Sequence, residues 1–300
     1  MELRIPKEGE ERYQWEKLDT VQEMLRRAEI LQKADKDLEF RAGLKELCRR
    51  DMVFFVDNFC WIYEPRPGME HIQPWHVYPH EIKQLDWMEQ RFLEREDGLI
   101  EKSREMGASW TFCLWLTHHF IFDDEFSALI GSRVEDLVDN KLPDSIFGKL
   151  EFILKYIPAW LRPRNFSFDK HRLYMKITNP NNHNALTGES ANSQFSRSGR
   201  YSCIVLDEFA FVDKSYSIWQ AAADSSPVRF PISTPNGKGN KFGELALTSD
   251  IKKLTLHWKL HPEKDQAWYE REKLRRTDQE VAQELDISYD RSQRGRVYAT

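Results

Sequence analysis

The feature that most constrains the fold is a short, unbroken apolar run that ends in two adjacent acids. Residues 203–206 are all apolar, and Asp207 and Glu208 follow directly. A run of this length, bounded by polar residues, is typical of a strand buried on both faces in a parallel sheet. The two carboxylates would then stand at the carboxyl end of that strand, where open α/β sheets place their ligand crevice.

Two adjacent acids in this position suit nucleotide hydrolysis. Asp207 would hold Mg²⁺, directly or through water, while Glu208 would orient and deprotonate the attacking water. The alternative is that the two acids merely begin a turn after a strand. The nucleotide interpretation therefore requires a phosphate-binding loop upstream.

Residues 102–109, with the sequence Lys-Ser-Arg-Glu-Met-Gly-Ala-Ser, have the setting of such a loop. They follow a short predicted strand at 98–101 and precede an apolar helix predicted over 110–120, which is the strand–loop–helix order of a P-loop. The N-terminus of that helix offers unpaired N–H groups to phosphate. The alternative is a surface turn between a strand and a helix.

The loop departs from the standard pattern G-x-x-x-x-G-K-[ST] at two positions. Gly107 matches the second glycine and Ser109 the Mg²⁺-binding hydroxyl. Lys102 replaces the first glycine, and Ala108 stands where the lysine is expected. A cation at the entrance of the loop can still swing over the β- and γ-phosphates, and Arg104 is a second cation in the same loop.

Hydrophobic periodicity and turn residues predict the remaining elements. We expect helices within 13–57, with a second segment over 38–59, and over 79–94, 134–142, 146–161 and 263–284. We expect strands over 126–131, 173–178, 185–188 and 253–257, and one that ends in Ser233-Thr234-Pro235. A small hydroxyl at that strand end can sense the γ-phosphate. The domains are predicted as a helical subdomain at 1–72, a core at 73–258, and a C-terminal helix and linker at 259–300.

Composition limits the other classes of function. The net charge is −5, so contacts with phosphate backbones must come from local patches. The four cysteines show no CxxC pairing and are expected to be buried free thiols rather than a zinc site. No signal peptide begins the chain, and no apolar run approaches the ~20 residues of a membrane span. We expect a soluble intracellular protein.

Arg197 and Arg200 either lie in a solvated loop or reach a nucleotide, and the basic cluster at 291–296 is either solvated or contacts DNA.

Taken together, three stretches resemble the ATPase region of large terminase subunits, the DNA-packaging motors of tailed bacteriophages. They are residues 102–110, 198–210 and 233–237, and residues 54–67 resemble the usual lead-in of that family. The resemblance covers roughly residues 40–300, and the order and separation of the motifs fit the family. Complete large terminases continue into an RNase H-like nuclease domain, which we do not find in this sequence, so no nuclease activity is expected.

The resemblance implies a role for each matching residue. Lys102 would be a displaced Walker A lysine, and Asp207 and Glu208 the Walker B pair. Ser233-Thr234-Pro235 would be the coupling motif. The adenine-recognising glutamine of the family has His80 in its place, with Gln73 as another candidate. The expected catalytic residues are Lys102, Arg104 and Glu208; the expected metal ligands are Ser109 and Asp207; and the expected nucleotide contacts are Lys102, Ser103, Arg104, Glu105, Met106, Gly107, Ala108, Ser109, Trp110, His80 and Thr234.

The sequence therefore predicts an α/β P-loop NTPase of the ASCE, RecA-like type, with a mainly parallel sheet flanked by helices and an N-terminal helical extension. The expected function is ATP hydrolysis with Mg²⁺, coupled to translocation of double-stranded DNA into the capsid. The resemblance implies a portal protein and a small terminase subunit as partners, a homo-oligomeric ring, and the cytoplasm of the infected bacterial host, at the procapsid. Two alternatives are a helicase or remodelling ATPase, and a non-hydrolysing docking module with a degenerate site.

Overall fold

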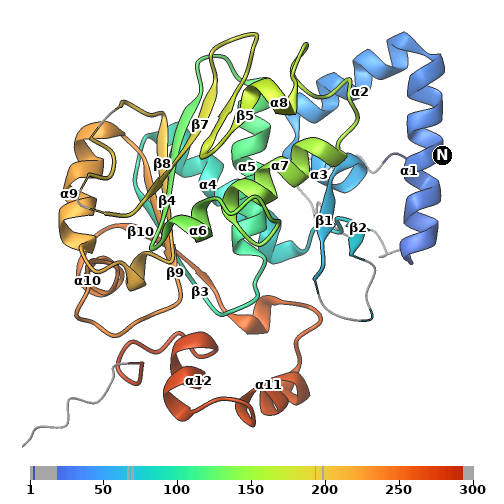
Figure 1. Ribbon diagram of the computed structural model, residues 1–300. Helices are drawn as coiled ribbons and strands as arrows, with labels where there is room; N and C mark the ends of the chain where they lie inside the picture. Colours follow the sequence, from blue (N-terminus) through green and yellow to red (C-terminus); the bar gives the residue numbers. More distant parts are fainter. Residues whose placement is uncertain are drawn as a thin grey trace, which may run out of the picture.

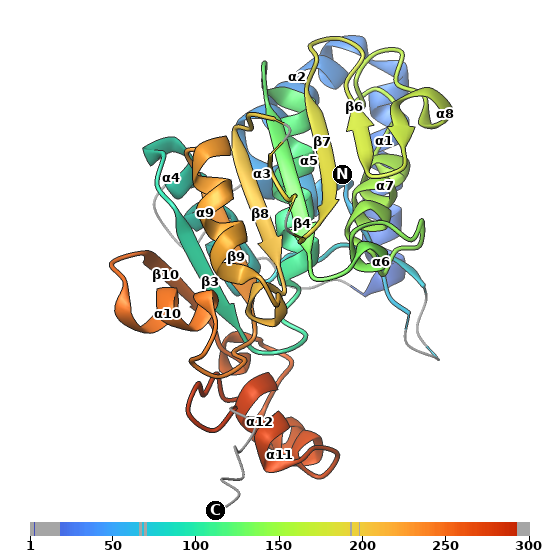
Figure 2. The ribbon, with the colours of Figure 1, turned by 60° about the vertical axis from the view of Figure 1, so that its left-hand side comes forward.

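A twisted eight-stranded sheet forms the centre of the molecule (Figures 1 and 2). The computed structural model describes residues 3, 19–65, 68, 71–192, 194–197 and 199–292. The strand order is β10-β3-β9-β8-β4-β7-β6-β5, parallel from β10 to β7 and antiparallel from β7 to β5. The strands are β3 (Gly98–Lys102), β4 (Ser127–Ser132), β5 (Arg172–Leu173), β6 (Lys176–Thr178), β7 (Ala185–Ser190), β8 (Cys203–Asp207), β9 (Arg229–Ser233) and β10 (Lys252–Leu256). The predicted mainly parallel α/β fold is confirmed.

Helices cover both faces of this sheet (Figures 1 and 2). On one face lie α4 (Pro79–Glu94), α5 (Ala108–Phe122) and α7 (Ile146–Tyr156); on the other lie α9 (Ser215–Ser225) and α10 (Lys241–Thr248). Strand β8 shows why two layers are needed. Cys203 and Val205 enter the core under α5, whereas Ile204 and Leu206 enter the core under α9. Alternate side chains of a strand point to opposite faces, so a wholly apolar strand must be covered twice.

The described part of the N-terminal extension has three helices, α1 (Thr20–Lys36), α2 (Leu38–Arg50) and α3 (Met52–Phe59), followed by a two-stranded hairpin, β1 (Trp61–Tyr63) and β2 (Ile72–Pro74). Each helix begins after an aspartate whose carboxylate accepts backbone N–H bonds of the first turn: Asp19, Asp37 and Asp51. These caps divide what periodicity predicts as longer helical segments. The predicted start near residue 13 lies outside the described residues. All four cysteines are free and buried, as expected.

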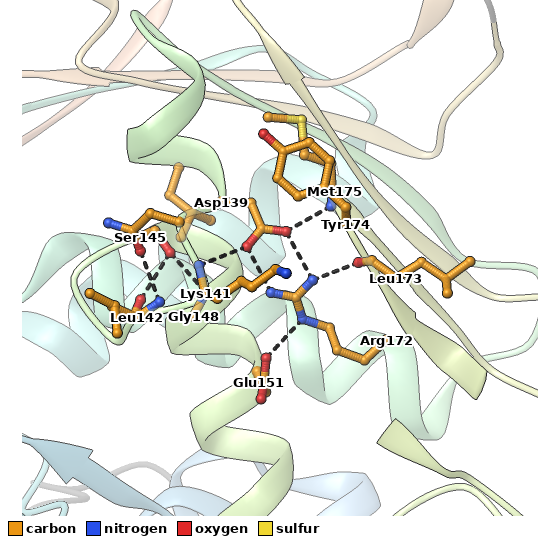
Figure 3. A network of polar contacts seen from close by, with 12 residues as sticks. Asp139, Lys141, Leu142, Ser145, Gly148, Glu151, Arg172, Leu173, Tyr174 and Met175 are labelled. Carbon is orange, nitrogen blue, oxygen red and sulfur yellow. Dashed lines mark hydrogen bonds and ion pairs between the residues drawn. The ribbon is translucent and has the colours of Figure 1, made fainter. Parts of the chain in front are cut away.

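Two elements are shorter than predicted because of one buried ion pair (Figure 3). The helix expected over 134–142 is only α6 (Glu135–Val138). Asp139 ends it: its carboxylate accepts the backbone N–H of Lys141 and two bonds from the Arg172 guanidinium, at 2.8 and 2.9 Å. The same carboxylate accepts the Met175 N–H at 2.7 Å, where a positive φ of 50° splits the strand predicted over 173–178 into β5 and β6.

The helix predicted over 146–161 ends at Tyr156, two residues before Pro158. A short helix, α8 (Phe168–His171), then precedes β5. The residues after β8 form a 3₁₀ turn, η1 (Phe209–Phe211). Among the described residues, no helix has both the length and the apolar character to cross a membrane.

The segment after β10 forms a small layer beyond the carboxyl ends of the parallel strands (Figure 1). It contains the 3₁₀ turn η2 (Trp258–Leu260) and the helices α11 (Gln266–Lys273) and α12 (Asp278–Glu284). The single helix predicted over 263–284 is thus interrupted. A new helix begins because Thr277 and Glu280 form a reciprocal capping box.

Candidate nucleotide-binding site

The loop between β3 and α5 has the open backbone that a phosphate site needs. Gly107, with a φ of 69°, is the N-cap of α5. A Cβ atom there would also collide with a carboxylate oxygen of Glu81, so glycine is required on two counts. The first helical bond runs from the Thr111 N–H to the Gly107 carbonyl, at 3.0 Å. Within the described chain, the N–H groups of residues 107–110 have no protein acceptor, and they lie at the positive end of the helix dipole.

The end of β8 meets this helix. The Ser109 hydroxyl donates to Asp207 Oδ2 at 3.0 Å, although 98 residues separate the two in sequence. Strand β9 lies between β3 and β8, and the register pairs Asp207 with Ile232 and Ser233 with Glu101. The carboxyl ends of the three strands are therefore level, and this is the edge at which open α/β sheets form their ligand crevice. The structure brings the two predicted metal ligands together.

Glu208 stands beside this pair in an unusual backbone conformation. Its φ and ψ are 53° and 35°, in the left-handed region. Its carboxylate lies 2.9 Å from Nε of Arg133, the residue that directly follows β4. Burial and the charge of Asp207 raise the pKa of Glu208, while Arg133 and Lys102 act in the opposite direction. A carboxylate with a raised pKa is a better proton acceptor than an ordinary glutamate.

The two predicted cations lie at the same edge. Lys102 ends β3, at the carboxyl edge of the sheet, and its charge lowers the pKa of Glu208. Arg104 follows in the loop with a guanidinium that is 60% exposed and lies 3.8 Å from the Glu284 carboxylate. Arg104 is therefore only loosely held and has room to turn toward a ligand. Glu105, also in the loop, has a positive φ of 57° and is exposed.

Ser103 is placed differently from the expectation of a nucleotide contact. Its hydroxyl donates to the Leu285 carbonyl at 2.6 Å and accepts the Trp258 N–H at 3.0 Å. Its own N–H donates to the Leu256 carbonyl at 2.9 Å. Both hydrogen-bond donors of Ser103, the hydroxyl and the N–H, are therefore bound to carbonyls of β10 and of the segment after it. Ser103 thus anchors the base of the loop.

The C-terminal layer holds the loop at two further points. The Arg104 N–H donates to the Glu284 carbonyl at 2.6 Å. The Lys264 ammonium donates to the carbonyls of Arg104 and Glu105, at 3.1 and 2.7 Å. The segment expected to be a helix and linker therefore packs directly on the phosphate-binding loop.

Helix α4 supports the loop from behind with three buried side chains. His80 Nε2 lies 3.2 Å from the Met106 carbonyl, and the Gln84 amide donates to the Ala108 carbonyl at 3.0 Å. Glu81 lies against Gly107. Burial and the neighbouring His261 lower the pKa of His80 to about 4, so its imidazole is neutral near pH 7.

The remaining predicted contacts vary in exposure. Met106 and Ala108 are buried, and the Trp110 ring packs edge-on against Trp75 and Phe152. Thr234 is buried just beyond β9. The adjacent Ser233 hydroxyl accepts the Ala210 N–H at 3.3 Å, so the predicted coupling motif contacts the η1 turn that follows Glu208.

Sequence reasoning missed Arg133, Gln84, Lys264 and Glu284. A signal existed for Arg133, because a charged residue directly after a strand predicted to be parallel stands at the ligand edge of the sheet. The other three depend on contacts between distant segments. Arg197 and Arg200 are exposed. Among the described residues, no ion pair joins either arginine to the site acids, so both interpretations of that loop remain open.

The fold and this arrangement of loop and acids define a P-loop NTPase of the ASCE type. The family described as "Terminase large subunit, T4likevirus-type, N-terminal" matches residues 99–297. The chain belongs to this large terminase family.

Solved structures of similar fold include the large terminase ATPase domain of Thermus phage P74-26. It has a TM-score of 0.50 and 18% identity, and the match covers 64% of this chain and 88% of that one. The large terminase of another thermophilic bacteriophage, in complex with ADP, has a TM-score of 0.53 and 14% identity, over 71% of this chain. The chain spans about half, 54%, of that ADP-bound protein. No curated protein sequence matches this chain.

Proposed function

We propose that this chain is the ATP-hydrolysing motor domain of a DNA-packaging terminase, which moves double-stranded DNA into a capsid. The observation that carries the proposal is the 3.0 Å contact between Ser109 and Asp207, with Glu208 directly beside it. This contact joins a helix N-terminus suited to phosphate with a carboxylate suited to Mg²⁺. Membership of the large terminase family and the ADP complex of the similar bacteriophage terminase support the same conclusion.

The residues present fit Mg²⁺ and a nucleoside triphosphate. The N–H groups of residues 107–110 lack protein acceptors in the described chain, and a hydroxyl and a carboxylate, both oxygen donors, already touch each other. Ser109 and Asp207 would hold the metal ion. When bound, Mg²⁺ supplies charge neutralisation at the β- and γ-phosphates. Lys102 and Arg104 add positive charge at the entrance of the loop, where negative charge develops during phosphoryl transfer.

Glu208 is the proposed general base. The raised pKa of Glu208 favours proton uptake, and the ion pair with Arg133 restricts the orientation of the carboxylate. Water would donate its proton to the Glu208 carboxylate as its oxygen attacks the γ-phosphorus in line, while the bond from that phosphorus to the β–γ bridging oxygen breaks and ADP leaves. The Ser233 contact with η1 gives the strand beside the phosphate site a direct link to the backbone that carries this base.

The wider setting follows from the family. We propose a portal protein and a small terminase subunit as partners. We also propose that identical subunits form a ring and that the protein acts in the host cytoplasm. We also propose that residues 1–72 form the helical extension, 73–258 the ATPase core and 259–300 the C-terminal segment, which rests on the loop through Leu285.

The test is Mg²⁺-dependent ATP turnover of the purified chain over a range of protein concentrations. Glu208→Gln is expected to retain nucleotide binding and lose turnover, because the amide cannot accept the proton. Lys102→Ala is expected to lose turnover and bind more weakly. Glu39→Gln, an exposed acid on α2, is the matched control and should turn over like the wild type.

Unchanged hydrolysis by Glu208→Gln would refute the proposed base. If Arg104→Ala alone abolishes turnover, Arg104 rather than Lys102 is the essential cation. If the wild-type chain neither binds nor hydrolyses nucleotide at any concentration, the chain is a docking module with a degenerate site.

A further inference from the structure

A basic hollow lies between α2 and the segment that connects α7 to α8. Its volume is about 500 Å³, and its lining includes Lys45 from α2 and Trp160, Arg162 and Arg164 from the connecting segment. The cations thus come from two parts of the chain that are more than one hundred residues apart. None of them belongs to the nucleotide-binding site.

The hollow has an uncompensated positive charge. Among the described residues, no ion pair engages Lys45, Arg162 or Arg164. The acid next to Lys45 is Glu46, whose carboxylate is bound by two other arginines of α2 at 2.6 and 2.5 Å. These arginines lower the pKa of Glu46 to about 2, so its carboxylate stays ionised and is paired with Arg49 and Arg50 rather than with Lys45. In a chain with a net charge of −5, three cations gathered around one hollow are a local exception.

The connecting segment presents its arginines on a rigid base. The Leu161 N–H donates to the Pro158 carbonyl at 3.0 Å, and the Phe166 N–H donates to the Pro163 carbonyl at 3.1 Å. Trp160 packs edge-on against Phe59 at a centroid distance of 5.5 Å. Two consecutive turns and a packed indole hold the backbone in place, so little conformational entropy is lost when a ligand binds.

The position of the hollow separates it from the hydrolytic site. α2 and α8 lie at the end of the molecule opposite α11 and α12 (Figure 1), and α12 contacts the loop between β3 and α5 through the Glu284 carbonyl. Figure 2 shows the same separation from a second direction. A ligand in the hollow would therefore not compete with a nucleotide.

We propose that this hollow binds the phosphate backbone of duplex DNA. Guanidinium groups match phosphate oxygens with paired N–H donors, and a lysine adds a mobile point charge. Two arginines and a lysine offer three cations for phosphate contacts, and contacts of this kind are independent of sequence. The inference rests on the proposed function only in naming DNA as the polyanion; the charge and shape of the hollow do not depend on ATP hydrolysis.

The test compares two charge-matched triple variants of the full chain. Lys45→Gln with Arg162→Gln and Arg164→Gln empties the hollow of charge. Lys83→Gln with Lys214→Gln and Lys252→Gln removes the same charge from exposed positions elsewhere. Binding to a short fluorescent DNA duplex of arbitrary sequence is measured over a series of salt concentrations, together with ATP turnover without DNA.

Each phosphate contact contributes about −0.9 to the slope of log K against log salt, so three contacts contribute about −2.7. In the hollow variant the slope of log K against log salt is expected to be less steep by that amount. The variant should also bind DNA at least about tenfold more weakly near 0.1 M salt. The control triple should change neither quantity. ATP turnover without DNA should be unchanged in both.

An unchanged slope and affinity in the hollow variant would overturn the proposal, and so would an equal loss in the control triple. Retained DNA binding combined with a lost interaction with an acidic protein partner would instead assign the hollow to that protein. If the triple variant does not fold, Arg164→Gln alone must still flatten the slope by about 0.9. A wild-type chain that binds DNA through the hollow but hydrolyses no ATP would refute the proposed function and leave this inference intact.

Discussion

Glu81 makes the stability of this protein depend on pH in a predictable way. Its carboxyl group is buried beneath the phosphate-binding loop and accepts the Tyr78 N–H at 2.9 Å. Among the described residues, no cation pairs with it. Burial raises its pKa from the ordinary 4.5 to about 7, despite the bonds from Tyr78 and Trp75, which act in the opposite direction.

The direction in which stability changes with pH follows from the order of the folded and unfolded pKa values of Glu81. The folded state holds the proton more tightly than the unfolded state, so the contribution is fully present below about pH 4.5 and is lost as the pH rises through about 7. At about 1.4 kcal/mol per pH unit, the loss over this window is roughly 3 kcal/mol. Glu81→Gln keeps an acceptor for the Tyr78 N–H but does not titrate, so the variant should not show this loss.

The assay is paired chemical unfolding of wild type and Glu81→Gln, followed by tryptophan fluorescence at about pH 5 and about pH 8. The free energy of unfolding of the variant, relative to wild type, should rise by roughly 2.5 kcal/mol between the two conditions, because part of the total loss already falls below pH 5. Gln84→Met, on the same buried face of α4, is neutral at every pH and should show a difference that does not change. A constant difference for Glu81→Gln would refute the assignment of a raised pKa to this carboxyl group.

Four shorter predictions concern other parts of the structure. Arg133→Gln removes a cation that lowers the pKa of Glu208, so the acid limb of the pH–rate profile should move to higher pH; an unmoved limb would contradict the pairing. Arg172→Met leaves a buried carboxylate unpaired and should cost about 3–5 kcal/mol in chemical unfolding, whereas a loss below about 1 kcal/mol would show that the pair is not buried in solution. Gly148→Ala would drive a methyl group into the backbone carbonyl of Leu142 and should lower the melting temperature sharply. Gly43→Ala, in an open helix position, should raise stability by about 0.5–1 kcal/mol instead.

Local sequence signals were sufficient to predict an element and its bounds where several of them agreed. The prediction for α4 matches residue for residue, because a proline at the first helical position, a capping acid at Glu81 and a regular apolar spacing all favour the same bounds. The run before Asp207 predicted a buried parallel strand for the same reason. The meeting of Ser109 with Asp207 could also be expected, since ends of parallel strands share one edge.

Other features depend on contacts that no local pattern contains. Asp139 stops its helix because an arginine from a later strand enters the core beside it. Ser103 was expected from the sequence to contact the nucleotide, yet its hydroxyl donates to the carbonyl of Leu285. The division between α11 and α12 is a different case. Thr277 and Glu280 have the spacing of a capping box, and that signal was present in the sequence.

The docking of α12 on the loop between β3 and α5 has a thermodynamic consequence. The Arg104 N–H and the Ser103 hydroxyl are both bound to carbonyls at the end of this helix. A ligand that prefers one shape of the loop therefore also prefers one position of α12. Linkage is reciprocal. If a ligand changes the equilibrium between docked and displaced α12 by some factor, displacement of α12 changes the affinity of the loop for that ligand by the same factor. Work done in displacing α12 and free energy of binding at the loop would then be coupled through these two hydrogen bonds.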